Sequence, residues 1–527
     1  MLGKIAIIDF LSRNNIRDIF YLPGIHTLPL SESLIGRKIN IFVPRHESSM
    51  AFMADGFARA SGNIGVLIVT PGPGLGNVVT GCMEAYGDNI PLLVIHIDTG
   101  REGIGKGILH ELIEPENMFQ YVTKQTFTVH GKEDLVGKLE NAYKSALTGR
   151  KGPVLISIPY ILLEKEVSSK VSSETNTISI DQFRDLTGLE EVLRQKRKPV
   201  IIGGKSLMFE QARALLDEIC ENSSIPFVTT TSGKGILDED NLWCFGNIMQ
   251  KGVVKEVVSS ADITIAIGTR LRDVDAKRRG VKIRELVHFE IDNTWFDKNY
   301  PASYKASGEM LPFLQYLRNI TRGKTFEWPL CELKEKQRQE QQGLYGKFLG
   351  FQLMQLLKES IPKNTTTVLD LSLMAYWAEY HYPVCQQRSF IMPRGISPIF
   401  YALPAAIGAK IAKPEKPCLA ICGDGGILPT IGELSTIKKY NIPVVVLIFN
   451  NNSFGILEDY MGATYSLEGT MKLENPDFLR VASAFGVKAK RVKNLRQLKT
   501  ILRDSVSWDE PFLLEFPGPV FAPPWRT

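Results

Sequence analysis

The sequence predicts an α/β protein made of three doubly wound domains with parallel sheets. The chain has 527 residues, which is more than one hydrophobic core usually organises, and about three domains are expected for this length. Short β-rich runs also alternate with helical patterns in three stretches of the chain. This alternation is typical of parallel sheets that carry helices on both faces.

Polar segments separate the three stretches and set the expected domain limits. The domains are expected at residues 1–163, 183–322 and 348–527. Apolar runs of strand length lie at residues 64–70, 91–97, 199–204, 263–268, 286–291, 418–422, 443–450 and 511–516, with a helical pattern at 48–60. Residues 165–182 are rich in Ser and Thr and poor in apolar residues, so a linker is expected there. A second linker, 324–347, is charged and Gln-rich and is expected to be partly helical.

Composition and charge argue against several classes of protein. The 62 basic and 57 acidic residues give a net charge of +5. The sequence has no basic block with interleaved aromatic residues, so nucleic acid is not an expected partner. Asp9 interrupts the apolar start, and no uncharged apolar run reaches the roughly 18 residues of a membrane span, so no signal peptide or membrane association is expected. The seven cysteines form no CxxC pair, which favours reduced thiols and a cytoplasmic location.

A glycine-rich loop with one carboxylate follows the apolar run 418–422. Residues 423–426 are Gly-Asp-Gly-Gly, and a helix is expected to start near Pro429 and to run through residue 440. Glycines after a buried strand usually let backbone N–H groups approach a phosphate. The carboxylate of Asp424 would repel that phosphate unless a cation lay between them.

An asparagine cluster, residues 450–453 (Asn-Asn-Asn-Ser), follows the next buried strand. Ligands of open α/β sheets bind outside the carboxyl ends of the strands, so Asp424 and this cluster are expected to meet. Carboxylate, amide and backbone carbonyl oxygens suit Mg²⁺, which often bridges a protein to a phosphate. The alternative is two ordinary turns without a ligand.

Together these two motifs resemble the diphosphate- and metal-binding motif of the thiamine diphosphate enzymes. The chain is most similar to the acetolactate synthase, benzoylformate decarboxylase and benzaldehyde lyase superfamily. The resemblance covers the whole chain, including its three blocks and the stretch YALPAAIGAK at 401–410. It implies an N-terminal pyrimidine-binding domain, a central domain and a C-terminal domain that binds diphosphate and Mg²⁺.

The resemblance implies thiamine diphosphate and Mg²⁺ as cofactors and assigns roles in the third block. The implied metal ligands are Asp424, Asn451 and the backbone carbonyl of Ser453. The implied diphosphate-binding residues are Gly423, Gly425 and Gly426. Ile399 falls where the family has a bulky aliphatic residue that wedges between the two cofactor rings and holds them bent.

A second match lies in the first block, where Arg-His-Glu at 45–47 precedes ADGFAR. Glu47 is expected at a helix start, where a carboxylate is an ordinary partner of the helix dipole. The resemblance implies instead that Glu47 is the catalytic glutamate, which hydrogen-bonds the cofactor's pyrimidine and shuttles a proton. Residues 70–79 resemble a loop that lies over the cofactor, which makes Pro71, Gly72 and Asn77 cofactor-binding candidates.

Two histidines are candidate catalytic residues by the same resemblance. His26 matches an active-site histidine of benzaldehyde lyase, and His110 falls where relatives place a Gln or His that faces the substrate. Histidines can relay protons near neutral pH, although an isolated histidine is more often structural. The remaining histidines are expected to be structural: His46, His96, His130, His288 and His381.

Several positions depart from acetolactate synthases and argue against acetolactate synthesis itself. Leu109-His110 replaces a Phe-Gln pair, Ile25 replaces the last residue of a Pro-Gly-Gly stretch, and Tyr460 replaces a Trp that selects the second substrate. Only some relatives bind FAD in the central domain. Residues 267–280 could cover FAD or another adenine nucleotide, but a solvated basic loop is the favoured interpretation.

The leading hypothesis is a Mg²⁺- and thiamine diphosphate-dependent enzyme that breaks or makes a C–C bond next to a carbonyl. Its most direct form is an acetolactate synthase-like decarboxylase or carboligase acting on a 2-keto acid. Alternatives are a 2-hydroxyketone lyase, suggested by His26, and a non-catalytic paralogue that binds a cofactor or nucleotide. In this family the glutamate and diphosphate blocks of one site come from different chains, which implies at least a homodimer and commonly a homotetramer.

Overall fold

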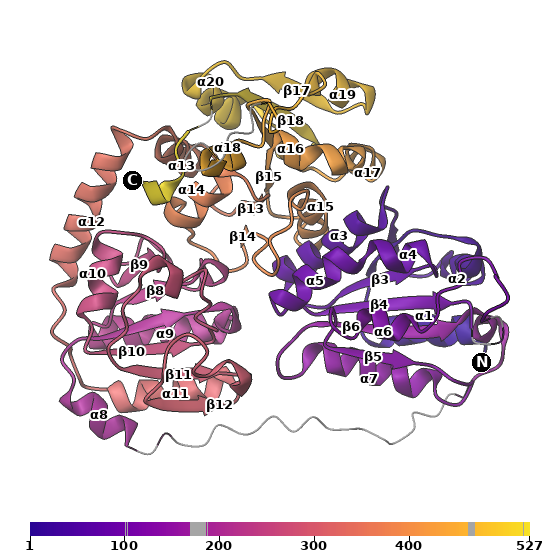
Figure 1. The fold of residues 1–527 in the computed structure, drawn as a ribbon, viewed down its shortest axis with the longest axis horizontal. Coiled ribbons are helices and arrows are strands. Elements are labelled where there is room, and N and C mark those ends of the chain that lie inside the picture. Colours follow the sequence, from indigo (N-terminus) through magenta and orange to yellow (C-terminus); the bar gives the residue numbers. More distant parts are fainter. Residues whose placement is uncertain are drawn as a thin grey trace.

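The computed structural model describes residues 1–100, 102, 104–168, 186, 188–461, 469–519 and 521–526. Within them the chain forms three six-stranded sheets, and helices flank each sheet (Figure 1). This confirms the predicted fold class. Every apolar run predicted as a strand lies on a strand, with ends correct to within two residues. Most of the predicted linker 165–182 lies outside the described residues.

The first unit has the strand order β2-β1-β3-β4-β6-β5, and its described pairs are parallel. Its strands are β1 (Asp18–Tyr21), β2 (Asn40–Phe42), β3 (Gly65–Val69), β4 (Leu92–Asp98), β5 (Gln125–Thr128) and β6 (Pro153–Pro159). Its helices are α1 (Gly3–Arg13), α2 (Leu28–Leu34), α3 (Glu47–Ser61), α4 (Pro73–Asn77), α5 (Val79–Gly87), α6 (Pro115–Phe119) and α7 (Leu135–Leu147). The central strands β3 and β4 are buried along their whole length, as parallel strands covered on both faces must be.

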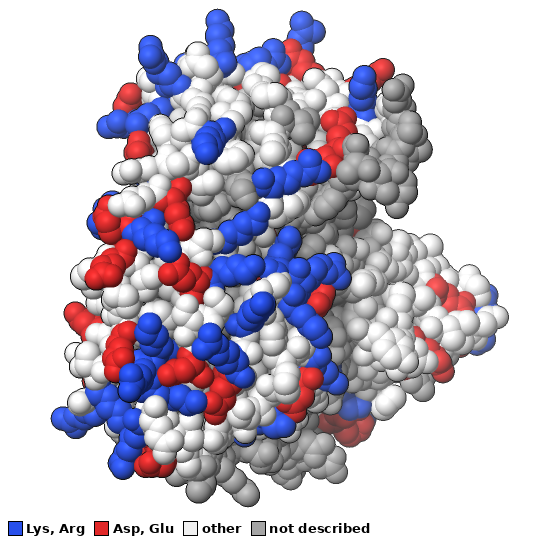
Figure 2. All heavy atoms as spheres, turned by 60° about the vertical axis from the view of Figure 1, so that its left-hand side comes forward, with Lys and Arg blue, Asp and Glu red and all other residues white. Residues whose placement is uncertain are grey.

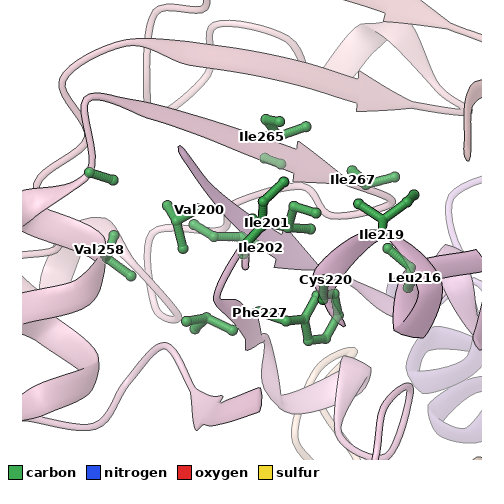
Figure 3. Packing of buried hydrophobic residues seen from close by; sticks show 14 of the residues in the cluster. Val200, Ile201, Ile202, Leu216, Ile219, Cys220, Phe227, Val258, Ile265 and Ile267 are labelled. Atoms are coloured by element: carbon green, nitrogen blue, oxygen red, sulfur yellow. The ribbon is translucent and has the colours of Figure 1, made fainter. Parts of the chain in front are cut away.

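The central unit has the order β9-β8-β7-β10-β11-β12, which is the 3-2-1-4-5-6 order of dinucleotide-binding folds. Its strands are β7 (Pro199–Gly203), β8 (Phe227–Thr229), β9 (Cys244–Asn247), β10 (Ile263–Ile267), β11 (Leu286–Glu290) and β12 (Tyr304–Ser307). Its helices are α8 (Leu189–Gln195), α9 (Glu210–Ser223), α10 (Val253–Ser260) and α11 (Met310–Thr321). Figure 3 shows aliphatic side chains of β7 and β10 packed between the flanking helices and Phe227.

The third unit has the order β14-β13-β15-β16-β18-β17, which repeats the order of the first unit position by position. Its strands are β13 (Thr366–Leu369), β14 (Phe390–Ile391), β15 (Cys418–Gly423), β16 (Val445–Asn450), β17 (Lys488–Arg491) and β18 (Phe512–Pro517). Its helices are α13 (Leu349–Ser360), α14 (Leu373–His381), α15 (Ala402–Ala412), α16 (Asp424–Ile427), α17 (Leu434–Lys439), α18 (Gly455–Met461), α19 (Phe478–Ala484) and α20 (Leu495–Thr500). The first and third units therefore share one sheet topology.

The segment predicted as a second linker is a packed helix, α12 (Leu330–Tyr345). Leu330, Leu333 and Gln337 are buried, and the Gln337 side chain donates a hydrogen bond of 2.8 Å to the backbone oxygen of Phe245. The segment therefore covers the central unit along its edge (Figure 1). Its charged composition belongs to the outer face of the helix.

Helix α3 of the first unit and helix α15 of the third unit pack directly against each other. A Cβ atom on Gly56 would lie 2.0 Å from the backbone oxygen of Ala405, and one on Gly408 would lie 1.8 Å from that of Met53. Both contacts require glycine. One hydrophobic core, which includes Met53 and Ala405, spans the two units, so their relative position in one chain is fixed by close packing.

The helix expected to start near Pro429 begins earlier, at Asp424, so that prediction was wrong. A short α-helix, α16, leads into a 3-10 helix at Leu428–Glu433 and then into α17. The two glycines of the loop lowered the expectation of helix, but the packing of their backbone overrides that preference. Pro429 lies in the first turn of the 3-10 helix, a position at which proline is well tolerated.

Surface and cysteine features agree with the composition. On the face shown in Figure 2, basic and acidic side chains are interspersed. The seven cysteines, all within the described residues, are free thiols. Among the described residues, no helix combines the length and the apolar character needed to cross a membrane.

Buried histidines predict that acid destabilises the fold. His96 on β4 is fully buried, and burial lowers its pKa to about 3, against about 6.5 in an unfolded chain. As the pH falls below 6.5, the unfolded state binds a proton that the native state refuses, so the free energy of unfolding falls by up to about 1.4 kcal/mol per pH unit. His96→Gln should therefore show a shallower loss of melting temperature between pH 7 and pH 5 than wild type. The exposed residue His130 supplies the control: His130→Gln should keep the wild-type slope, and equal slopes for all three proteins would contradict the prediction.

Candidate active site

Loops at the carboxyl ends of β13, β15, β16 and β18 enclose a cavity of about 370 Å³ in the third unit, here called the third-unit cavity. This is the edge at which open α/β sheets bind ligands. The predicted third-block residues that line it are Ile399, Gly423, Asp424, Gly425, Gly426, Asn451 and Ser453. Much of the remaining wall is apolar and includes Phe449, Phe454 and Phe516.

Three oxygen atoms, here called the three-oxygen cluster, converge in this cavity. The side-chain oxygen of Asn451 lies 3.0 Å from the backbone oxygen of Ser453 and 3.3 Å from Oδ1 of Asp424. Rotating the Asn451 amide would turn both contacts into hydrogen bonds. The two orientations of the amide thus fit two states of the cluster: hydrogen bonds among the three residues without an ion, or three oxygen ligands around a bound cation.

Asn475 supports Asp424 and was missed by the sequence analysis. Its Nδ2 donates to Oδ2 of Asp424 at 2.8 Å and to Oδ1 of Asn450 at 2.9 Å. Burial raises the pKa of Asp424, and hydrogen bonds from Asn475 and from neighbouring backbone N–H groups partly offset that effect. The neighbours of the Asp424 carboxylate that offset its burial are neutral hydrogen-bond donors and not cations. Asn475 lies in a segment without a recognisable motif, so no sequence signal pointed to it.

Two of the loop glycines are required by packing inside the chain. A Cβ atom on Gly425 would lie 2.5 Å from the Phe454 ring, and one on Gly426 would lie 2.4 Å from Oδ2 of Asp370. A Cβ on Gly423 would meet only an ordinary contact at 3.5 Å, with Ser372. Close packing inside the chain is therefore one reason for glycine at positions 425 and 426, beside the approach to a phosphate that the sequence predicts.

In the first unit, Glu47 is the first residue of α3. The preceding residue, His46, caps the helix by accepting a hydrogen bond of 3.1 Å from the backbone N–H of Ser48 through Nδ1, which gives His46 a structural role. Oε2 of Glu47 accepts a hydrogen bond of 2.9 Å from Nδ2 of Asn77. The side chain of Asn77, at the end of α4, thereby restrains the carboxylate.

The loop that carries Asn77 turns at Pro71 and Gly72. Gly72 has a φ of +62°, a conformation that L side chains rarely adopt. A Cβ atom there would also lie 3.1 Å from the backbone of His110. His110 itself has a φ of +65°, uncommon outside glycine although less so for histidine. The loop and the His110 turn are therefore packed tightly together.

His26 and His110 lie side by side, with ring centroids 5.5 Å apart. His26 sits in one turn of 3-10 helix at Ile25–Thr27. Burial lowers the pKa of His26, and the neighbouring His110 lowers it further. Nδ1 of each ring is buried and lacks a hydrogen-bond partner among the described residues. Glu47, Gly72, Asn77, His26 and His110 are called the first-unit cluster below.

The structure places the candidate residues in two separate groups. The residues that line the third-unit cavity all belong to the third unit in the described part of the chain. The first-unit cluster lies outside that cavity. The side chain of Tyr460, the candidate for selecting a second substrate, lies outside the described residues.

The ligand crevice of the central unit, at the ends of β7 and β10, is nearly closed. A cavity of about 30 Å³ remains among Asp88, Lys205, Arg270, Arg272 and Asp275. This is room for little more than one water molecule, whereas small-molecule sites usually measure about 300–1,000 Å³.

The loop at 267–280 is only partly the solvated basic loop that was expected. The side chains of Arg270 and Arg272 are 13% and 17% exposed and lie 3.9 Å from Oδ1 of Asp88 in the first unit. Arg272 and Arg394 both pair with Asp275, at 2.7 and 2.9 Å. The prediction failed here because the partner carboxylate Asp88 comes from another domain.

Three parallel α/β units with polar loops gathered at the strand ends define a class of protein, the α/β enzymes that hold a small cofactor at that edge. Residues 1–120, 186–317 and 370–516 match, respectively, the N-terminal TPP binding domain, the central domain and the C-terminal TPP binding domain described for thiamine pyrophosphate enzymes. The chain belongs to the thiamine pyrophosphate enzyme family.

Relatives within this family carry two kinds of name. A probable acetolactate synthase large subunit from Methanocaldococcus jannaschii is 30% identical over 98% of this chain and 91% of its own length. A probable 2-ketoarginine decarboxylase from Pseudomonas aeruginosa is 31% identical over 94% of this chain and 90% of its own length. Acetolactate synthase isozyme 2 large subunit from Escherichia coli is 26% identical over 98% of this chain and 95% of its own length. These matches support thiamine diphosphate as the cofactor, with the reaction class open between ligation and decarboxylation.

Proposed function

We propose that this chain is a Mg²⁺- and thiamine diphosphate-dependent enzyme that decarboxylates a 2-keto acid and protonates or ligates the product. The observation that carries the proposal is the three-oxygen cluster of Asp424, Asn451 and Ser453. Adjacent ligands in an octahedral Mg²⁺ shell lie about 3.0 Å apart, and the two distances in the cluster are 3.0 and 3.3 Å. The residues therefore fit the ion that the reaction requires.

The third-unit cavity would hold the cofactor's diphosphate and thiazole. Asp424, Asn451 and the Ser453 carbonyl would hold Mg²⁺ against the diphosphate, and Gly423 lies in the wall of the same cavity. Ile399 forms part of the cavity wall and would support the bent cofactor. When bound, thiamine diphosphate supplies a carbon nucleophile that adds to carbonyl groups and accepts the electrons of the broken C–C bond.

The first-unit cluster would supply the proton-transfer groups. Glu47, restrained by Asn77, would hold and move a proton at the pyrimidine ring. His26 and His110 would face the substrate and exchange protons with its carbonyl or hydroxyl oxygen, since Nδ1 of each ring has no hydrogen-bond partner within the described part of the chain.

We also propose that each active site forms between two chains, in a homodimer or a homotetramer built from such dimers. Two observations support this. The first-unit cluster and the third-unit cavity of one chain are separate, and apolar side chains near the cluster are exposed, among them Ile25 at 62%, Leu109 at 60% and Ile113 at 64%. Grouped exposed apolar residues often mark interaction surfaces.

Subunit mixing tests the shared site. Glu47→Gln and Asp424→Ala proteins should each be inactive. A mixed dimer places both lesions in one site and leaves the other intact, so random exchange should restore roughly a quarter of wild-type activity in a two-fold symmetric dimer. Mass spectrometry of the mixture verifies that exchange occurred. If exchange is complete and activity stays absent, each site lies within one chain.

The reaction itself is tested with the purified protein, thiamine diphosphate and Mg²⁺. CO₂ release is measured from 2-keto acids with aliphatic, aromatic and guanidino side chains, and aldehyde release is measured from 2-hydroxyketones. CO₂ from any 2-keto acid supports the proposal. Aldehyde without CO₂ identifies a 2-hydroxyketone lyase, and cofactor binding without either product identifies a non-catalytic paralogue.

A further inference from the structure

Residues 395–401, here called the clamped segment, connect β14 to α15 and carry Ile399 in the middle. The backbone N–H groups of Gly395, Ile396 and Ser397 donate to the carboxylate of Glu84, at 2.9, 2.8 and 3.2 Å. This carboxylate comes from α5 of the first unit. One side chain therefore holds the start of the segment through three hydrogen bonds.

A second carboxylate holds the end of the clamped segment. The N–H groups of Phe400 and Tyr401 donate to Asp370, which follows β13, at 3.1 and 3.3 Å. Asp370 also accepts from Leu371 at 3.0 Å. In this segment only Pro398, which has no N–H, and Ile399 stand between the two anchored ends.

The backbone inside the segment is strained, so it needs such anchors. Ser397 and Phe400 have φ values of +60° and +62°, which L residues avoid unless their surroundings impose them. Five N–H groups directed at two carboxylates impose this conformation. The result fixes where the Ile399 side chain meets the third-unit cavity.

Both anchors are themselves held in place. Glu84 and Asp370 are 0% and 1% exposed. Glu84 also pairs with Arg59 at 2.9 Å, and Arg59 in turn pairs with Asp88 at 2.6 Å. Asp370 lies against the glycine-rich loop at residues 423–426, since a Cβ atom on Gly426 would be 2.4 Å from its Oδ2. Asp370 thus contacts both the loop proposed to bind diphosphate and the segment that carries Ile399.

We propose that Glu84 and Asp370 are positioning residues that fix the clamped segment, and with it Ile399, before the cofactor binds. The proposal rests on the proposed function, because it assigns Ile399 a role toward thiamine diphosphate. Neither carboxylate acts on the substrate. Their effect is on the pre-formed shape of the cavity wall.

The test compares Glu84→Gln and Asp370→Asn with the matched control Asp88→Asn. Each substitution keeps the side-chain size and replaces one buried carboxyl oxygen with an NH₂ group, which cannot accept a hydrogen bond, but Asp88 pairs with Arg59 without bonding to the clamped segment. In cofactor-free protein, amide hydrogen exchange of residues 395–401 should be at least about tenfold faster in the two anchor variants, because local opening becomes easier. It should remain at the wild-type rate in Asp88→Asn.

A second readout follows the cofactor. With thiamine diphosphate and Mg²⁺ bound, exchange of the thiazolium proton should be about 10- to 100-fold slower in the anchor variants, because small misplacements of reacting groups cost this much. If Glu84→Gln does not fold, Asp370→Asn alone tests whether the anchoring carboxylates fix the clamped segment.

If a folded anchor variant exchanges both its amide protons and the thiazolium proton at wild-type rates, the proposal that Glu84 and Asp370 fix the clamped segment is wrong. Failure of the wild-type protein to bind thiamine diphosphate would instead overturn the proposed function. The amide exchange would still test the clamp in that case.

Discussion

Asp424→Ala is expected to abolish measurable binding of thiamine diphosphate in the presence of Mg²⁺. Asp424 is the only charged member of the three-oxygen cluster, since Asn451 and the Ser453 carbonyl are neutral. Without it the ion loses its strongest oxygen ligand, and the diphosphate faces the loop without a bridging cation. The loss of cofactor affinity should exceed the roughly 10- to 100-fold loss that is typical when a residue hydrogen-bonded to a metal ligand is changed.

Calorimetric titration of the cofactor measures this effect, with two variants as comparisons. Asn451→Ala removes a neutral ligand and should weaken binding less than Asp424→Ala. Asn475→Ala leaves all three oxygens in place and removes the hydrogen bonds that Asn475 donates to Oδ2 of Asp424 and to Oδ1 of Asn450, so its loss should stay within about 10- to 100-fold. Wild-type affinity in the Asp424 variant would contradict the assignment of the cluster to Mg²⁺.

The fold could be predicted from the sequence because it follows from local patterns. Buried parallel strands appear as apolar runs bounded by turns, and each predicted run, from residues 64–70 to residues 511–516, lies on a strand. The start of α16 at Asp424 could not be predicted in the same way. It depends on the packing of Gly425 and Gly426 against Phe454 and Asp370, which are distant in sequence.

Some residues of the candidate site could be predicted from local sequence, and others could not. Asp424 and Asn451 follow neighbouring strands, so a general rule of sheet geometry was enough to bring them together. Asn475, Glu84 and Asp370 act through contacts with segments far away in the chain, and nothing in their local sequence marks them. Arg270 and Arg272 were read as solvated because their partner, Asp88, lies in another domain.

Glu47→Gln is expected to keep cofactor affinity close to wild type and to lose most of the turnover. The amide has the size of the carboxylate, and its oxygen can still accept the hydrogen bond from Asn77. It cannot take up and return a proton, and positioned acid–base groups typically contribute about 10²–10⁴-fold. The retained binding separates this variant from Asp424→Ala, whose defect comes before any chemistry.

Exchange of the thiazolium proton with deuterium, followed by NMR, isolates the step in which Glu47 would act. The exchange should slow by the same factor as turnover if the carboxylate moves the proton that activates the cofactor. Asn77→Ala is the comparison variant, because it keeps the carboxylate and removes the hydrogen bond that orients it. With its cofactor site saturated, its exchange should be slowed less. If Glu47→Gln exchanges at the wild-type rate, then the carboxylate only complements the positive end of α3, and the proton must be moved by another group in the site.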